Sequence, residues 1–176
     1  MRTWMMAALA ALAMSSDARA AVVDATPNGF QVEETASIAA PATKVWAAIG
    51  QWGDWWNSAH SWSGDAHNIT LDLKPGGCLC EALPNGGGAR HMTVLMSMPD
   101  RLLVLDGALG PLMLSGADGH MRFKLAEKAG VTTVTMDYWV GGYLPAGLDK
   151  IAGDVDGVLA EQTGRLKAYV ETGKSG

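Results

Sequence analysis

Basic residues are few and scattered in this chain of 176 residues, which has 13 Lys and Arg against 18 Asp and Glu. The formal net charge is −5, and no Lys/Arg cluster occurs anywhere along the sequence. Nucleic acids and anionic membrane surfaces attract proteins through clustered positive charge. The charge pattern therefore excludes nucleic acid as a partner and makes an anionic membrane surface a poor one.

Long apolar runs and motifs for metal or phosphate chemistry are also missing. Beyond Met14 no apolar segment approaches the roughly 20 residues of a transmembrane helix, so we expect no stable membrane insertion of the remaining chain. The four histidines are dispersed without the spacing of a metal motif. No nucleophile elbow and no phosphate-binding loop occurs. We therefore expect neither a metal nor any other cofactor.

Cysteine is nearly absent, with only Cys78 and Cys80 in the chain. At positions i and i+2 of a predicted strand, the two side chains point to the same face. Three interpretations stay open, in order of preference: buried and inert thiols, a disulfide, or a metal or redox site that would need further ligands such as His91. An oxidising compartment would permit the disulfide.

The N-terminus, in contrast, has the pattern of a secretory signal peptide. Arg2 precedes the uncharged apolar run Trp4–Met14, and Ala18 and Ala20 then form the A-x-A arrangement that a signal peptidase reads. We predict that the first 20 residues are a signal peptide, cleaved after Ala20. The protein is accordingly expected to be periplasmic or secreted.

The rest of the chain is predicted to form one α+β domain over residues 30–172, after a leader at 21–29 and before a tail at 173–176. Alternating apolar and polar residues predict short strands, which pair antiparallel because no helix intervenes to make parallel crossovers. A long helix over about 146–172 carries an apolar stripe that only the sheet is large enough to cover. The predicted strands are 30–38, 69–74, 78–83, 90–98, 102–105, 121–125 and 134–140.

This order of elements resembles the START/Bet v 1-like superfamily, also called SRPBCC or polyketide cyclase-like. The resemblance rests on PATKVWAAIGQWGDWW after the first strand and GGYLPAGLDKIAGDVDGVLAEQTGRLKAYVE at the end. The segment GGCLCE, followed by RHM, is similar to an exported subgroup. The resemblance implies a helix-grip fold: a curved antiparallel sheet of six or seven strands around the C-terminal helix, two short helices after strand 1, and a deep hydrophobic cavity between sheet and helix.

Five tryptophans lie between residues 46 and 62. Such large, stiff side chains either close one end of the core or line a ligand cavity. We expect Trp55 and Trp56 to face a ligand. The other candidate ligand-binding residues are Arg90, His91, Met92 and Tyr138.

The sequence favours a binding protein for a small hydrophobic or amphipathic molecule, such as a lipid, an aromatic compound or a polyketide-like compound. The alternative is a cyclase or dehydratase that uses the same cavity, with His91 as the proton-transfer residue. A third hypothesis is an interaction protein like the chaperone-activator branch of the superfamily. Ligand identity and oligomeric state stay open, because fold alone does not imply function.

Overall fold

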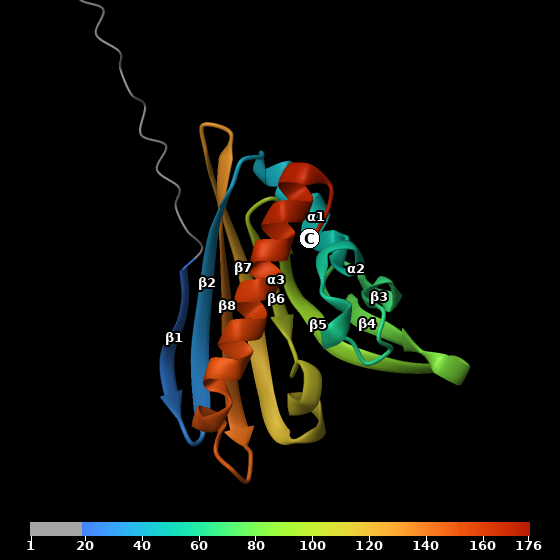
Figure 1. Cartoon of the computed structure of the whole chain (residues 1–176), viewed down its shortest axis with the longest axis vertical. Helices are drawn as coiled ribbons and strands as arrows, with labels where there is room; N and C mark the ends of the chain where they lie inside the picture. The colour runs from blue at the N-terminus through green and yellow to red at the C-terminus, as the bar shows by residue number, and fades with distance from the viewer. Residues whose placement is uncertain (1–18) are drawn as a thin grey trace, which may run out of the picture.

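The computed structural model describes residues 19–176, and Figure 1 shows one open sheet with a long helix lying across it. The predicted signal peptide falls almost wholly outside the described residues, so its processing stays a prediction. The strands are β1 (Arg19–Thr26), β2 (Gly29–Ile38), β3 (Ile69–Leu71), β4 (Cys78–Leu83), β5 (Gly87–Met98), β6 (Leu102–Asp106), β7 (Gly116–Lys128) and β8 (Val131–Tyr143).

Three α-helices and five 3₁₀ turns complete the fold. The α-helices are α1 (Ala42–Gly50), α2 (Trp52–Trp55) and α3 (Ala152–Thr172). The 3₁₀ turns are η1 (Ser58–His60), η2 (Ala66–Asn68), η3 (Pro84–Gly86), η4 (Gly110–Leu114) and η5 (Leu148–Lys150). The two short helices after the first strand of the predicted domain are thus present as α1 and α2.

The sheet has eight strands in the order β1-β2-β8-β7-β6-β5-β4-β3, and every neighbouring pair is antiparallel. The sequence predicted six or seven. The additional strand is β1, which pairs with β2 and includes most of the segment expected to be a leader. Its exposed Val22 and Val23 explain why alternation did not reveal it, because both apolar residues stand next to each other.

Helix α3 packs against β2 and β1, and its buried face includes Leu159, Leu166 and Val170. The helix begins six residues later than predicted, at Ala152. A helix that began at residue 146 would have to pass through Gly147. The φ of Gly147 is +90°, which is not helical, so the chain forms the separate 3₁₀ turn η5 before α3. Strand β2 turns every second residue inward under α3, as its alternation predicted.

The observed architecture confirms the α+β helix-grip arrangement, with a curved antiparallel sheet gripping one C-terminal helix (Figure 1). One edge of the sheet, formed by β5, β4 and β3, bends away from α3 and carries α2 above it. The space between this edge, the middle of the sheet and α3 is where a cavity can form. Among residues 19–176, no helix is long and apolar enough to cross a bilayer.

Candidate functional site

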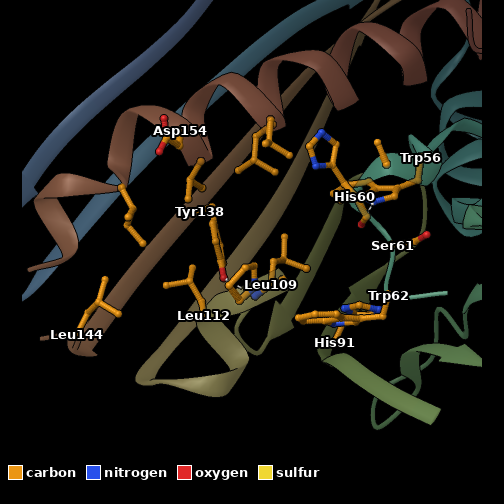
Figure 2. Close-up of a pocket in the computed structure, with 17 residues that line it drawn as sticks. Trp56, His60, Ser61, Trp62, His91, Leu109, Leu112, Tyr138, Leu144 and Asp154 are labelled. Atoms are coloured by element: carbon orange, nitrogen blue, oxygen red, sulfur yellow. Dashed lines mark hydrogen bonds between the residues drawn. The ribbon is translucent and has the colours of Figure 1, made fainter. Parts of the chain in front are cut away.

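A cavity of about 520 Å³ lies between α3 and the sheet, which is within the usual size of small-molecule sites. Figure 2 shows α3 above it, η4 below it, and the η1 segment closing the end where Trp56, Trp62 and His91 lie. Most lining side chains are apolar. They come from the η4 loop, the end of β8 and one face of α3: Leu109, Pro111, Leu112, Leu144, Ile151, Val155, Val158 and Leu159.

Most of the polar lining groups gather at one end of the cavity, and Asp154 on α3 lies apart from them. His60, Ser61 and His91 lie at the end closed by η1, whereas Leu144 and Leu112 lie toward the other end (Figure 2). A molecule in this cavity would meet several hydrogen-bonding groups at the η1 end, and mainly hydrocarbon together with the Asp154 carboxylate toward the other end. The arrangement suits an amphipathic compound.

The η1 wall is fastened to α3 and to its own turn. Trp56 Nε1 donates to the carbonyl of His60 at 2.9 Å, and the His60 ring lies 3.4 Å from a Glu161 carboxylate oxygen on α3. The backbone N–H of Asn57 donates to Gln162, also on α3, at 2.8 Å. These contacts join η1 to α3, so the two elements form one continuous wall of the cavity.

Tyr138 on β8 fastens the opposite wall. Its hydroxyl accepts from the backbone N–H of Leu109 at 3.0 Å and donates to the carbonyl of Gly107 at 3.3 Å. Burial raises the pKa of Tyr138 above its ordinary value, so the hydroxyl keeps its proton. Tyr138 therefore lines the cavity with its ring and secures the η4 loop with its oxygen (Figure 2).

The chemically most specific feature is a buried pair, Glu81 on β4 and His91 on β5. His91 Nε2 lies 2.9 Å from Glu81 Oε2, and the two residues are 7% and 1% exposed. The same carboxylate accepts backbone N–H groups from Trp62 at 3.1 Å and Ser63 at 2.5 Å. Burial raises the pKa of Glu81, but hydrogen bonds from Ser63, Trp62 and His91 outweigh it and hold that pKa below its usual value.

An ionised Glu81 fixes the hydrogen on the His91 ring. A carboxylate can only accept, so Nε2 of His91 must donate. In the neutral imidazole, Nδ1 then carries the lone pair. Among the described residues no hydrogen bond uses that nitrogen, and His91 lines the cavity. The pair can therefore offer a ligand a hydrogen-bond acceptor or a general base.

A β-bulge places His91 on the cavity side. Leu79 pairs with Met92 and Cys80 pairs with Arg90, so His91 is an extra residue on β5. His91 and Met92 are consecutive, yet both are buried. In an unbulged strand two neighbours would face opposite sides of the sheet.

Cys78 and Cys80 form a disulfide with a Cα–Cα distance of 5.3 Å. Of the three interpretations left open by the sequence, inert thiols, a disulfide, or a metal or redox site, the structure has the disulfide. The pair alternates along β4 with the buried Leu79 and Glu81, so the disulfide lies on the face of the sheet away from the cavity. Within residues 19–176 no group of three or more His, Cys, Asp or Glu side chains converges to hold a metal ion.

The structure brings three of the candidate ligand-binding residues to the cavity: Trp56, His91 and Tyr138. Trp55 and Met92, each 1% exposed, lie in the core and do not line it. Trp55 donates from Nε1 to the carbonyl of Ala48 at 2.9 Å, which turns its ring into α1. Arg90 is exposed on the other face of the sheet, opposite Cys80.

Trp55 belongs to a compact aromatic cluster, defined here as Trp52, Trp55 and Trp56. The ring centroid of Trp52 lies 4.7 Å from that of Trp55 and 5.0 Å from that of Trp56. Only Trp56 reaches the cavity, so the cluster both closes one end of the core and supplies one ring to the wall. The two roles considered for the tryptophans are thus divided among neighbours.

Sequence reasoning missed several lining residues, above all His60, Ser61 and the η4 loop. Neither segment has the periodicity of a helix or strand, so no pattern signalled an inward face. Glu81 and His91 fall in the predicted strands 78–83 and 90–98, but the sequence does not show which residues of these strands pair. The bulge sets the pairing register of β4 and β5, and the alternation of apolar and polar residues does not show where such an extra residue lies.

Solved structures share the fold at low sequence identity. CalU16 from Micromonospora echinospora has a TM-score of 0.58 at 16% identity, over 87% of this chain and 83% of CalU16. DynU16, from the dynemicin biosynthetic locus, has a TM-score of 0.59 at 20% identity, over 82% of this chain but 48% of DynU16. The Aha1 dimer from Colwellia psychrerythraea has a TM-score of 0.55 at 17% identity, over 82% of this chain and 98% of Aha1.

A search of curated protein sequences found no significant match. Residues 29–171 match a family described as polyketide cyclase / dehydrase and lipid transport, which agrees with the superfamily resemblance seen in the sequence. That match covers nearly the whole described domain, including α3 and every residue that lines the cavity. The chain belongs to the polyketide cyclase / dehydrase and lipid transport family.

Proposed function

We propose that this protein binds a small hydrophobic or amphipathic molecule in the cavity between the sheet and α3. The observation that carries the proposal is the cavity itself, with about 520 Å³ of space, mainly apolar walls and most of its polar lining groups at the η1 end. Ligand sites typically combine a mainly apolar lining with a few placed polar groups. Lipids, aromatic compounds and polyketide-like compounds all fit this description.

The polar end gives the ligand its orientation. A hydroxyl of the ligand would donate a hydrogen bond to Nδ1 of His91 or to Ser61, and its hydrocarbon would extend toward Leu144 and Ile151. Glu81 supports this by fixing the His91 ring. Trp62, which is 42% exposed, covers the same end at the boundary with solvent.

The first test is native mass spectrometry of protein purified from the periplasm, followed by extraction and identification of any compound that leaves it. We expect a stoichiometric hydrophobic compound, or uptake of one from a panel of lipids and aromatic metabolites. A protein that arrives empty and stays empty throughout the panel would contradict the proposal.

A pair of matched variants locates the binding. Val158→Phe adds a ring inside the cavity, whereas Val131→Phe adds the same ring at the exposed β7–β8 turn. With the neutral fluorescent probe N-phenyl-1-naphthylamine, we expect Val158→Phe to weaken binding about tenfold, or about 1.4 kcal/mol, because the added ring occupies space that the probe needs. Val131→Phe should bind as wild type does. Equal effects of both variants would place the probe elsewhere.

The Glu81–His91 pair favours a second candidate function, a cyclase or dehydratase of polyketide-like substrates. His91 Nδ1 would take a proton from a carbon or hydroxyl of a substrate that the cavity holds in a folded shape. His91→Ala separates the two functions. A binder loses only modest affinity, whereas an enzyme that uses His91 loses turnover by roughly 10²–10⁴-fold.

Export is part of the proposal. The signal-like segment up to Ala20 supports it, and the Cys78–Cys80 disulfide suits an oxidising compartment. Cleavage after Ala20 would leave Ala21–Thr26 of β1 in the sheet. Intact mass of protein from the bacterial periplasm should correspond to a chain that starts at Ala21. A full-length cytoplasmic product would contradict export.

A further inference from the structure

The Cys78–Cys80 disulfide spans a single residue of β4, and it tightens the strand there. Its Cα–Cα distance is 5.3 Å, whereas two steps along an ordinary strand cover roughly 6.6 Å. Cross-links that close long loops stabilise most, because they remove most disorder from the unfolded chain. This ring encloses almost no loop. Overall stability is therefore a weak explanation for it.

The tightened segment lies directly opposite the bulge. Cys78 pairs with Thr93 and Cys80 with Arg90, so two steps of β4 face three steps of β5. The extra residue on β5 is His91. A bulge bends its strand and increases the local twist. The disulfide fixes the matching stretch of the partner strand in a tighter pleat than a free strand adopts.

Both members of the buried pair are attached to this unit. Glu81 follows Cys80 in β4, and His91 follows Arg90, the partner of Cys80, in β5. On the other side, Gly107 packs closely against the bulge, since a Cβ there would lie 2.3 Å from the carbonyl oxygen of His91. The His91 backbone is thus held between the disulfide-locked strand and Gly107. The sulfur atoms themselves lie away from the cavity.

We propose that the Cys78–Cys80 disulfide is a positioning element that keeps the bulge, and with it the His91–Glu81 hydrogen bond, in the geometry the cavity uses. It acts through the backbone and touches no ligand. Opening it lets β4 relax toward the ordinary strand rise and releases His91 from Glu81. The consequence for ligand binding rests on the proposed function, but the consequence for the His91 ring does not.

The test compares mature wild type with the double variant Cys78→Ser/Cys80→Ser, both without ligand. Long-range ¹H–¹⁵N spectra of the imidazoles report which ring nitrogen carries the proton. We expect wild-type His91 to show one tautomer with hydrogen on Nε2, and the variant to show a mixture of both tautomers. His60, His67 and His120 are internal controls and should keep their signals, because none adjoins the disulfide.

A second measurement avoids dependence on the variant. Folded wild type treated with a phosphine reductant should show the same change in His91 alone, and reoxidation should restore the original spectrum. An unchanged His91 spectrum after reduction would overturn the proposal. So would loss of structure throughout the protein, because the disulfide would then be a general staple.

The N-phenyl-1-naphthylamine affinity of the same samples separates this inference from the proposed function. If His91 responds to reduction in a protein that binds no probe, the positioning role stands and the binding proposal falls. If the probe binds and His91 does not respond, the reverse holds.

Discussion

Two glutamates of this protein are equally buried, but their pKa values are shifted in opposite directions. Glu81 on β4 is 1% exposed and Glu34 on β2 is 0% exposed. Glu81 accepts hydrogen bonds from two backbone N–H groups and from His91, and its pKa lies below the usual value. No N–H group donates to either oxygen of Glu34 among the described residues, and the group that faces it is another carboxyl, Asp156 on α3. Burial, followed by the negative charge of Asp156 and a hydrogen bond that protonated Glu34 shares with it, raises the pKa of Glu34 to about 8.

The difference shows that burial alone does not decide whether a carboxyl is charged. Donors aimed at the oxygens keep Glu81 ionised inside the protein, and their absence leaves Glu34 neutral at mildly acidic and neutral pH. Glu81 holds the His91 ring by a hydrogen bond, whereas Glu34 on β2 faces Asp156 of α3.

The largest expected effect comes from substituting Glu81, the ionised glutamate of the two. Glu81→Gln replaces one accepting oxygen by an amide N–H that faces other donors. We expect a loss of about 3 kcal/mol of unfolding free energy at pH 7, because hydrogen bonds to charged groups contribute about 1.5–3 kcal/mol each. Urea unfolding measures it. Glu33→Gln, half-buried on the other face of β2, is the control and should stay within about 0.5 kcal/mol of wild type.

Glu34→Gln replaces a carboxyl that can ionise by an amide that cannot. The variant should therefore be more stable than wild type at higher pH. Wild type must either bind a proton or bury a charge as pH rises toward 8, and the amide does neither. We expect the advantage of the variant to grow by about 2 kcal/mol between pH 5.5 and 7.5, since a raised pKa costs up to about 1.4 kcal/mol per pH unit. An advantage that does not change with pH would contradict a raised pKa.

The pH dependence of the wild-type unfolding free energy tests the same difference between Glu34 and Glu81. The pKa of Glu34 is raised on folding, so its contribution is complete below the ordinary value of 4.5 and is lost as pH rises toward about 8. The pKa of Glu81 is lowered, so its contribution is present above 4.5 and is lost as pH falls. Unfolding free energy measured in urea should therefore peak near pH 4.5 and fall on both sides. Stability that rises steadily from pH 5 to 8 would count against this assignment.

The smallest effect is expected from Asp156→Asn. Removing the facing charge lowers the pKa of Glu34, but only part of the way to its ordinary value, because burial is the larger cause. The ¹³C shift of the Glu34 carboxyl across a pH titration measures the change. A return to 4.5 would mean that Asp156, and not burial, dominates.

Much of the fold could be predicted because alternation and the apolar stripe of α3 follow directly from burial. The site was less accessible. Of the candidate ligand-binding residues, Trp56, His91 and Tyr138 line the cavity, whereas Trp55, Arg90 and Met92 do not. One extra residue in β5 changes which neighbour faces inward, and a four-residue helix such as α2 has no periodicity to read.

The aromatic cluster Trp52, Trp55 and Trp56 gives the protein an intrinsic spectroscopic probe. Indole rings with centroids 4.7 to 5.8 Å apart are close enough for their electronic transitions to couple, which gives a strong circular dichroism signal in the ultraviolet. Trp56 is the one ring of the three that borders the cavity. Entry of any guest would change one oscillator of a coupled set, so occupancy could be followed without a label.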